Sequence, residues 1–386
     1  MDFSLTAEQQ MLKDSVEKFV ASEYDATQRE KLLEAPDAFS RAHWKTFAEL
    51  GWLTIPFSEE QGGFGGGIVE SATLMEAFGK ALVLEPFVDT VLLAGQLLAR
   101  GANTADHELL LSQLMAGEVQ GAFAWQERQS RFHLSHCETT AKKQGSNYLL
   151  SGTKTLVSNA DADFVVVSAR TAGNTEDANG ISLFAVKLDD RVNTTRIRLM
   201  DGRHAMKVQF DELSVPAASL LGDVGEALPL MQSVVDEVTV ALCAEAVGAM
   251  DYLYKATAEY TNTRKQFGQP IGKFQALQHR MVDMFMKTEQ CRSLLIRAMC
   301  AVSDGSDDIP EAVSAVKSMV GRYGRAVAEE AVQIHGGMGV TNEMNIGHYL
   351  KRLMMIDMSF GNADFHRRRF CSSRYREQAL DLALAS

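Results

Sequence analysis

Four consecutive residues, Arg264, Lys265, Gln266 and Phe267, combine two cations, an amide and an aromatic ring. A guanidinium group can donate two parallel hydrogen bonds to phosphate oxygens, and an adjacent ring can lie against a heterocycle. The group therefore suits a nucleotide that carries a diphosphate. The alternative is a helix end whose basic residues complement the helix dipole before a capping Gly268.

Two helices must position this group. Upstream, apolar residues recur at helical spacing, which predicts one long helix that runs into Arg264: Leu228, Met231, Val234, Val235, Val238, Leu242, Val247 and Leu253. Gly268 and Pro270 then end the helix. A second apolar pattern starts at Phe274, so the four residues lie at a turn between helices.

A second candidate segment is QIHGGMG, residues 333–339. Its three glycines permit the backbone to approach a ligand closely. A helix-ending turn with His335 as a satisfied polar residue explains the same pattern. Further on, the basic run 366–369 (HRRR) could meet phosphates, or it could be a turn of solvated side chains.

Composition restricts the class of protein. The chain has 386 residues, 46% of them hydrophobic, enough for two or three domains. Its net charge of −12 argues against nucleic-acid binding. The five cysteines include no CxxC pair, and we expect neither a metal site nor disulfides. The first residues resemble no signal peptide, and no run of eighteen apolar residues occurs, so we expect a cytoplasmic protein without a membrane segment.

The periodicity of the chain changes twice. Thr6 and Gln9 fit a capping box before a first amphipathic helix, and helical patterns continue to about residue 119. Residues 120–222 contain short segments rich in β-branched and aromatic residues, typical of a small antiparallel barrel or sandwich. Residues 223–386 are helical again. We therefore expect an α+β fold with domains 1–119, 120–222 and 223–386.

The string RKQFGQPIGKFQALQHRMVDM, which starts at Arg264, resembles the signature of the acyl-CoA dehydrogenase family. The resemblance extends over nearly the whole chain. It implies an N-terminal helical domain, a central β-domain and a C-terminal four-helix domain. It also implies FAD as cofactor, an acyl-CoA thioester as substrate and a site that a neighbouring subunit completes.

The resemblance assigns cofactor contacts residue by residue. The half that meets a neighbour's FAD is expected to comprise Arg264, Gln266, Phe267, Gln275, Gln333, Gly336 and Gly337. Ser158 is expected to offer a hydroxyl to the flavin, and Asn362 and Asp364 lie where flavin or phosphate contacts occur.

Three departures from the family pattern concern the reactive half of the site. Residues 126–133 (QERQSRFH) stand where relatives have a glycine-containing flavin loop. Residues 156–159 (LVSN) stand where relatives have a Trp-Ile-Thr-Asn strand that packs against the flavin ring, and they lack the tryptophan. Dehydrogenation needs a carboxylate that takes the α-proton. Many relatives carry this glutamate where Phe360 stands here. Other relatives place it on the long helix at Val238, which leaves Glu237 as a candidate base, or as part of an exposed acidic face with Asp236.

Within the family, segments such as MDFSLTAEQQMLKDSV and LKRLMMIDMSFGNAD resemble the small subunit of two-chain enzymes of the pimeloyl-CoA dehydrogenase type. This implies an α2β2 assembly with a larger paralogous subunit that acts on dicarboxylyl-CoA or steroid side-chain CoA. An electron-transfer flavoprotein would accept the electrons. Two alternatives stay open: a self-sufficient homotetramer that uses Glu237 or another carboxylate, and a non-catalytic scaffold or nucleotide-binding protein.

Overall fold

The structure, a computed structural model, describes residues 4–341 and 344–375, and its elements follow the order helices, strands, helices. The predicted α+β fold class is therefore confirmed. By contact density the chain forms two units: Met1–Glu30 with Ile68–Val83 and Thr239–Ser386, and Lys31–Gly67 with Leu84–Val238. The domain boundaries at residues 119 and 222 stay a prediction.

Short helices make up the N-terminal part. They are α1 (Ala7–Glu23), α2 (Ala26–Glu34), α3 (Arg41–Glu49), α4 (Ile68–Ala81), α5 (Gln96–Gly101) and α6 (Ala105–Met115), and a π-helix at Val88–Gly95 precedes α5. Thr6 and Gln9 form the predicted capping box of α1. The sequence did not predict α2, because this short polar helix buries only Arg29 and Leu33.

The central part is an eight-stranded sheet within the described residues, in the order β6-β7-β3-β2-β4-β5-β8 with β1 beside β4. Its strands are β1 (Gly121–Ala124), β2 (Thr140–Gln144), β3 (Asn147–Ser158), β4 (Phe164–Arg170), β5 (Ile181–Lys187), β6 (Asn193–Arg198), β7 (His204–Pro216) and β8 (Leu220–Leu221). The expected antiparallel arrangement holds for the other strand pairs, but β1 runs parallel to β4, and β2 meets β4 in parallel where Thr140 pairs with Arg170. The sequence also missed β6, because its exposed polar side chains show no apolar alternation.

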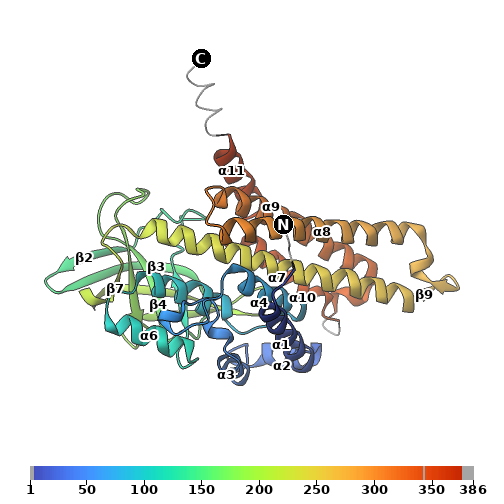
Figure 1. The fold of residues 1–386 in the computed structure, drawn as a ribbon, viewed down its shortest axis with the longest axis horizontal. Helices are drawn as coiled ribbons and strands as arrows, with labels where there is room; N and C mark the ends of the chain where they lie inside the picture. The colour runs from blue at the N-terminus through green and yellow to red at the C-terminus, as the bar shows by residue number, and fades with distance from the viewer. Residues whose placement is uncertain (1–3, 342–343, 376–386) are drawn as a thin grey trace, which may run out of the picture. The chain divides into compact units, whose positions relative to one another are not determined.

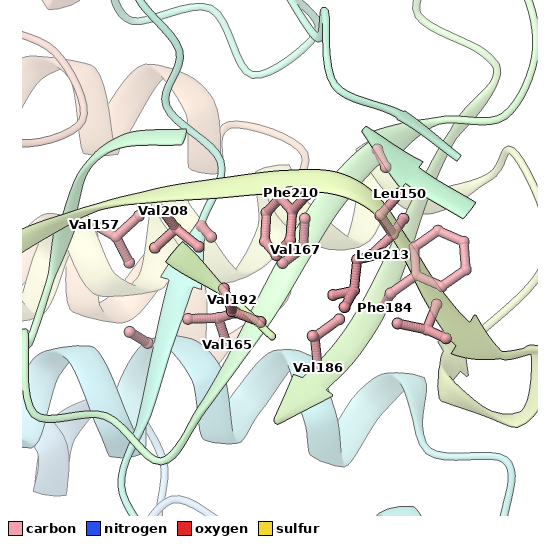
Figure 2. Close-up of a cluster of buried hydrophobic side chains, with 14 of the residues drawn as sticks. Leu150, Val157, Val165, Val167, Phe184, Val186, Val192, Val208, Phe210 and Leu213 are labelled. Atoms are coloured by element: carbon pink, nitrogen blue, oxygen red, sulfur yellow. The ribbon is translucent and has the colours of Figure 1, made fainter. Parts of the chain in front are cut away.

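One face of the sheet holds the β core. Figure 2 shows Val165, Val167, Phe184, Val208 and Phe210 gathered between the strands, and all five are at most 2% exposed. Side chains two positions apart along a strand point to the same face, so Val165 and Val167 of β4 share a side, as do Val208 and Phe210 of β7. Phe184 of β5 packs in the same cluster. This packing fixes the strand ends that carry the predicted flavin loop and Ser158.

The C-terminal part is a bundle of long helices. It comprises α7 (Ala227–Thr263), α8 (Gln275–Ser303), α9 (Ile309–His335), α10 (Ile346–Met358) and α11 (Ala363–Arg374). A small hairpin of β9 (Lys265–Gln266) and β10 (Gln269–Pro270) joins α7 to α8. Figure 1 shows it where α7 ends and α8 begins. The four residues 264–267 therefore lie between two helices, as predicted.

Glycines allow α4 and α7 to cross closely. A Cβ added at Gly79 would lie 1.9 Å from the carbonyl oxygen of Glu245, and one at Gly248 would lie 2.0 Å from that of Glu76. Neither position has room for a side chain. The two helices therefore pack backbone against backbone, which holds α4 close to α7.

Candidate functional site

The hairpin presents its tip to solvent. Phe267 and Gly268 have φ values of 55° and 76°, so both central residues of the turn are left-handed, as in the mirror-image turns of two-residue hairpins. Gln266 pairs with Gln269 across it. The ring of Phe267 is 91% exposed. The sequence predicted a turn between two helices at these residues, but helical periodicity did not reveal that the turn is a β-hairpin.

Arg264 has a fixed backbone and an open side chain. Its N–H donates to Tyr260 O at 2.8 Å and its carbonyl accepts from the Ile271 N–H at 2.9 Å. Among the described residues the guanidinium makes no ion pair, and it is exposed together with Lys265 and Gln266. The group thus keeps its donors available for an anion.

The end of α9 offers open backbone. Gln333, Gly336 and Gly337 are exposed, and a Cβ added at either glycine would meet nothing within 4 Å. His335 instead is buried and its Nδ1 lies 2.8 Å from Ala331 O. Burial lowers the pKa of this imidazole, so His335 is a satisfied, neutral core residue.

An aromatic contact joins the two segments. The rings of Tyr260 and His335 stack with centroids 4.2 Å apart at 25°. Arg264 follows Tyr260 by one helical turn, and Gly336 directly follows His335. The structure therefore brings the ends of α7 and α9 together, and exposed Gln275 starts the neighbouring α8. The exposed guanidinium of Arg264 and the two open glycines, at helix ends that this ring contact joins, fit the diphosphate of a dinucleotide such as FAD.

The β-domain half is differently built. The Nε2 of Gln126 donates to Arg131 O at 3.4 Å, so this side chain is folded back on its own loop. Leu156 is 44% exposed with a φ of 52°, at a point where the pairing register of β3 shifts. Ser158 is partly exposed at the end of β3, opposite Ala205. Ser158 was the flavin contact expected in these two segments, and that contact stays a prediction.

A buried ion pair, which sequence reasoning missed, anchors that loop. The Nζ of Lys154 donates to Glu127 Oε1 at 2.7 Å, and neither side chain is more than 3% exposed. Glu127 also accepts from the Thr139 N–H at 2.9 Å. Burial alone would raise the pKa of Glu127, but Lys154 and these donors hold it below its usual value. Glu127 lies in the loop after β1 and Lys154 on β3, and no local pattern links residues 27 positions apart.

The candidate base Glu237 has a partner. Its carboxylate accepts from both terminal nitrogens of Arg100, at 2.7 and 2.5 Å. Its neighbour Asp236 is buried, so the two do not form the exposed acidic face that was the alternative. Both carboxylate oxygens of Glu237 are thus engaged by Arg100, and the role of Glu237 as the base stays a prediction.

The turn before α11 uses its polar groups locally. Phe360 lies between α10 and α11, and the Asn362 side chain caps α11 by accepting from the Phe365 N–H at 3.0 Å. Asp364 pairs with Arg367 at 3.2 Å on the surface. The prediction of a four-residue basic patch was wrong for His366, which is 1% exposed.

Residues 4–341 and 344–375 contain no cluster of three or more histidine, cysteine or acidic side chains that could hold a metal ion. By length and composition α7 could cross a membrane, but 72% of its most apolar window is buried inside the protein. That burial is typical of the core helix of a soluble protein.

Comparison with known proteins follows the same division of the chain. Three domain descriptions of the acyl-CoA dehydrogenase family match it: the N-terminal domain at residues 6–118, the middle domain at 122–213 and the C-terminal domain at 228–372. A probable acyl-CoA dehydrogenase of Bacillus subtilis, YngJ, is 28% identical over 374 residues, which cover 95% of this chain and 98% of that protein.

Solved structures agree with these matches. A chain in the structure described as "Electron transferring flavoprotein of Acidaminococcus fermentans" has 28% identity and a TM-score of 0.88, with 97% of this chain and 99% of that chain covered. A chain of the ChsE4–ChsE5 complex from Mycobacterium tuberculosis has 25% identity and a TM-score of 0.87, with 98% and 99% covered. The chain belongs to the acyl-CoA dehydrogenase family.

Proposed function

We propose that this chain is the small subunit of a cytoplasmic, heteromeric FAD-dependent acyl-CoA dehydrogenase, and that a larger paralogous subunit supplies the catalytic base. The assembly is α2β2. Its substrate is a dicarboxylyl-CoA or a steroid side-chain CoA, and an electron-transfer flavoprotein accepts the electrons. The complex of two differently named proteins among the similar structures supports this arrangement.

The observation that carries the proposal is the state of the carboxylates. Proton abstraction next to a thioester needs a carboxylate that is free to bind the proton. Glu237 is paired with Arg100, and Glu245, further along α7, is paired with Arg352. Phe360, at the position where many relatives carry the base, cannot accept a proton. The two positions where relatives carry the base thus hold Phe360 and Val238. The neighbouring glutamates of α7, Glu237 and Glu245, are both paired with arginines.

The hairpin end of the bundle supports the other half of the proposal. The open guanidinium of Arg264 and the open backbone at Gly336 fit the diphosphate of a cofactor held mainly by another subunit. Apolar side chains surround this end at 45–91% exposure: Phe267, Val282, Phe285 and Met286. Apolar surface of this kind is typical of contacts between protein chains.

The chemistry divides between the two subunits. FAD, when bound, supplies the acceptor for the hydride that leaves the β-carbon. The small subunit holds the diphosphate through Arg264 and the backbone at Gly336 and Gly337. The carboxylate that takes the α-proton belongs to the larger subunit in this proposal.

Expression with and without the larger paralogue tests the proposal. We expect the chain purified alone to be colourless and inactive, and the co-purified complex to be yellow and to reduce an electron acceptor with an acyl-CoA. Arg264→Gln should then remove flavin from the complex, and Arg264→Lys should restore little of it because the fork geometry is lost. A yellow, active chain that loses turnover on Glu237→Gln would instead establish the homotetramer. If no paralogue restores activity, the scaffold alternative holds.

A further inference from the structure

The four residues between α10 and α11 form a turn with unusual backbone angles. Phe360 has a φ of 55° and Gly361 a φ of 117°, so two successive residues lie in the left-handed half of the φ range. A Cβ added at Gly361 would lie only 2.4 Å from a ring carbon of Phe365. A phenylalanine adopts such a φ only when its surroundings hold it there.

Two buried side chains hold the carbonyl groups of this turn. The Nζ of Lys317 donates to Asp357 O at 2.9 Å and to Gly361 O at 2.6 Å. The imidazole Nε2 of His366 lies 3.1 Å from Phe360 O. Lys317 has no exposed surface and His366 is 1% exposed. The carbonyl groups of Phe360 and of Gly361 therefore each have a buried donor.

One face of α9 is shaped to receive the turn. Ser314, Lys317, Ser318 and Gly321 follow one another at helical spacing, so their side-chain positions share that face. Ser314 Oγ lies 3.4 Å from His366 Nδ1, and Ser318 Oγ donates to Ala363 O at 3.0 Å. A Cβ at position 321 would lie 2.0 Å from the Asp357 carboxylate. Gly321 thus leaves the space in which that carboxylate sits.

The protonation states agree with these roles. Burial lowers the pKa of His366 to about 3, so the imidazole is neutral at physiological pH. With Ser314 Oγ–H donating to Nδ1, the proton on Nε2 is free to bond Phe360 O; this tautomer follows from the hydrogen-bond network. Burial likewise lowers the pKa of Lys317 to about 8. A neutral amine still has two N–H groups for two carbonyls, so the contacts persist on either side of that pH.

An apolar side chain at position 317 would avoid the desolvation of an amine. What the amine adds is the pair of hydrogen bonds that keep residue 360 in its left-handed conformation. We propose that Lys317 and His366 are positioning residues that fix Phe360 against the acyl group of a bound thioester. The identity of the ligand rests on the proposed function, whereas the holding of the turn does not.

Hydrogen exchange of the whole chain tests the holding role. Lys317→Met keeps the length of the side chain and removes the donor, and Lys351→Met, at an exposed lysine of α10, is the matched control. We expect the amides of residues 361–366 to exchange about tenfold faster in Lys317→Met alone, with the thermal midpoint and the other helices unchanged. Uniformly faster exchange, or no local change, overturns the proposal. If Lys317→Met does not fold, His366→Gln provides the same measurement on the other donor.

Ligand binding tests the consequence for residue 360. In the co-purified complex, Lys317→Met and Phe360→Ala should each weaken acyl-CoA binding about fivefold, and the double variant should be no weaker than either. Additive losses would show that Lys317 acts by another route and overturn the positioning role. If the wild-type complex and all variants fail to bind acyl-CoA, the proposed function is wrong. If Lys317→Met still shows the local exchange effect in that case, Lys317 holds the turn independently of that function.

Discussion

Removal of either partner of the buried Glu245–Arg352 pair should destabilise the helical unit by about 3–5 kcal/mol, because the remaining charge would stay buried without its counterion. The two side chains are 1% and 10% exposed. Their two hydrogen bonds, from Nε and from one terminal nitrogen, are both 2.6 Å long. The structure thus predicts large effects for Glu245→Gln and for Arg352→Met.

The surface pair Asp364–Arg367 is a matched control. It joins the same kinds of groups at 3.2 Å, but its side chains are 67% and 71% exposed. Water and salt screen such a pair, so Asp364→Asn should change the stability by less than about 1 kcal/mol. The contrast between the two pairs isolates the effect of burial.

Thermal unfolding followed by circular dichroism is a suitable assay. For a chain of this size, a loss of 4 kcal/mol lowers the midpoint by about 5 °C. The double variant Glu245→Leu/Arg352→Met removes both charges together and should recover most of the loss. The reasoning is refuted if the single variants behave like the surface control, or if the double variant is as unstable as the worse single one.

Three further predictions concern other parts of the helical unit. Gly248→Ala should cost about 1–3 kcal/mol of stability, because its Cβ would lie 2.0 Å from Glu76 O; a thermal midpoint equal to wild type would contradict this. Gly337→Ala, which meets nothing within 4 Å, should leave that midpoint unchanged but release flavin from the co-purified complex, measured by absorbance after gel filtration. The pKa of His366 falls from 6.5 to about 3 on folding, so the unfolded state binds the proton first as the pH is lowered. Wild-type stability should therefore fall by about 2–3 kcal/mol between pH 6.5 and 4.5 more than that of His366→Gln; parallel pH curves from urea unfolding would refute this.

Local patterns predicted the elements of the fold well where the signal lies within a few residues. Thr6 and Gln9 are three positions apart, and their capping box forms as predicted. The switch from helical to alternating periodicity likewise located the central sheet. In contrast, β6 has exposed residues on nearly every position, so no alternation marked it.

The candidate site depended on partners far apart in sequence. Glu237 and Arg100 are 137 positions apart, and nothing near Glu237 indicates that its carboxylate is paired. The sequence suggested that His366 belongs to a basic run, because three arginines follow it. In the structure its ring is buried and contacts the backbone carbonyl of Phe360. Sequence shows which groups are present, whereas tertiary packing decides which of them stay available.

The same distinction explains why the two halves of the proposed site differ. The Lys154–Glu127 pair is buried, and it holds the loop that follows Trp125 against β3. Arg264 lies on the surface without a partner among the described residues, at the end of a helix that its charge stabilises only slightly. A guanidinium without an ion pair contributes little to the stability of the fold. We therefore expect Arg264 to act in ligand binding. The contrast therefore agrees with the proposal that the chain contributes a binding surface to a site completed by another subunit.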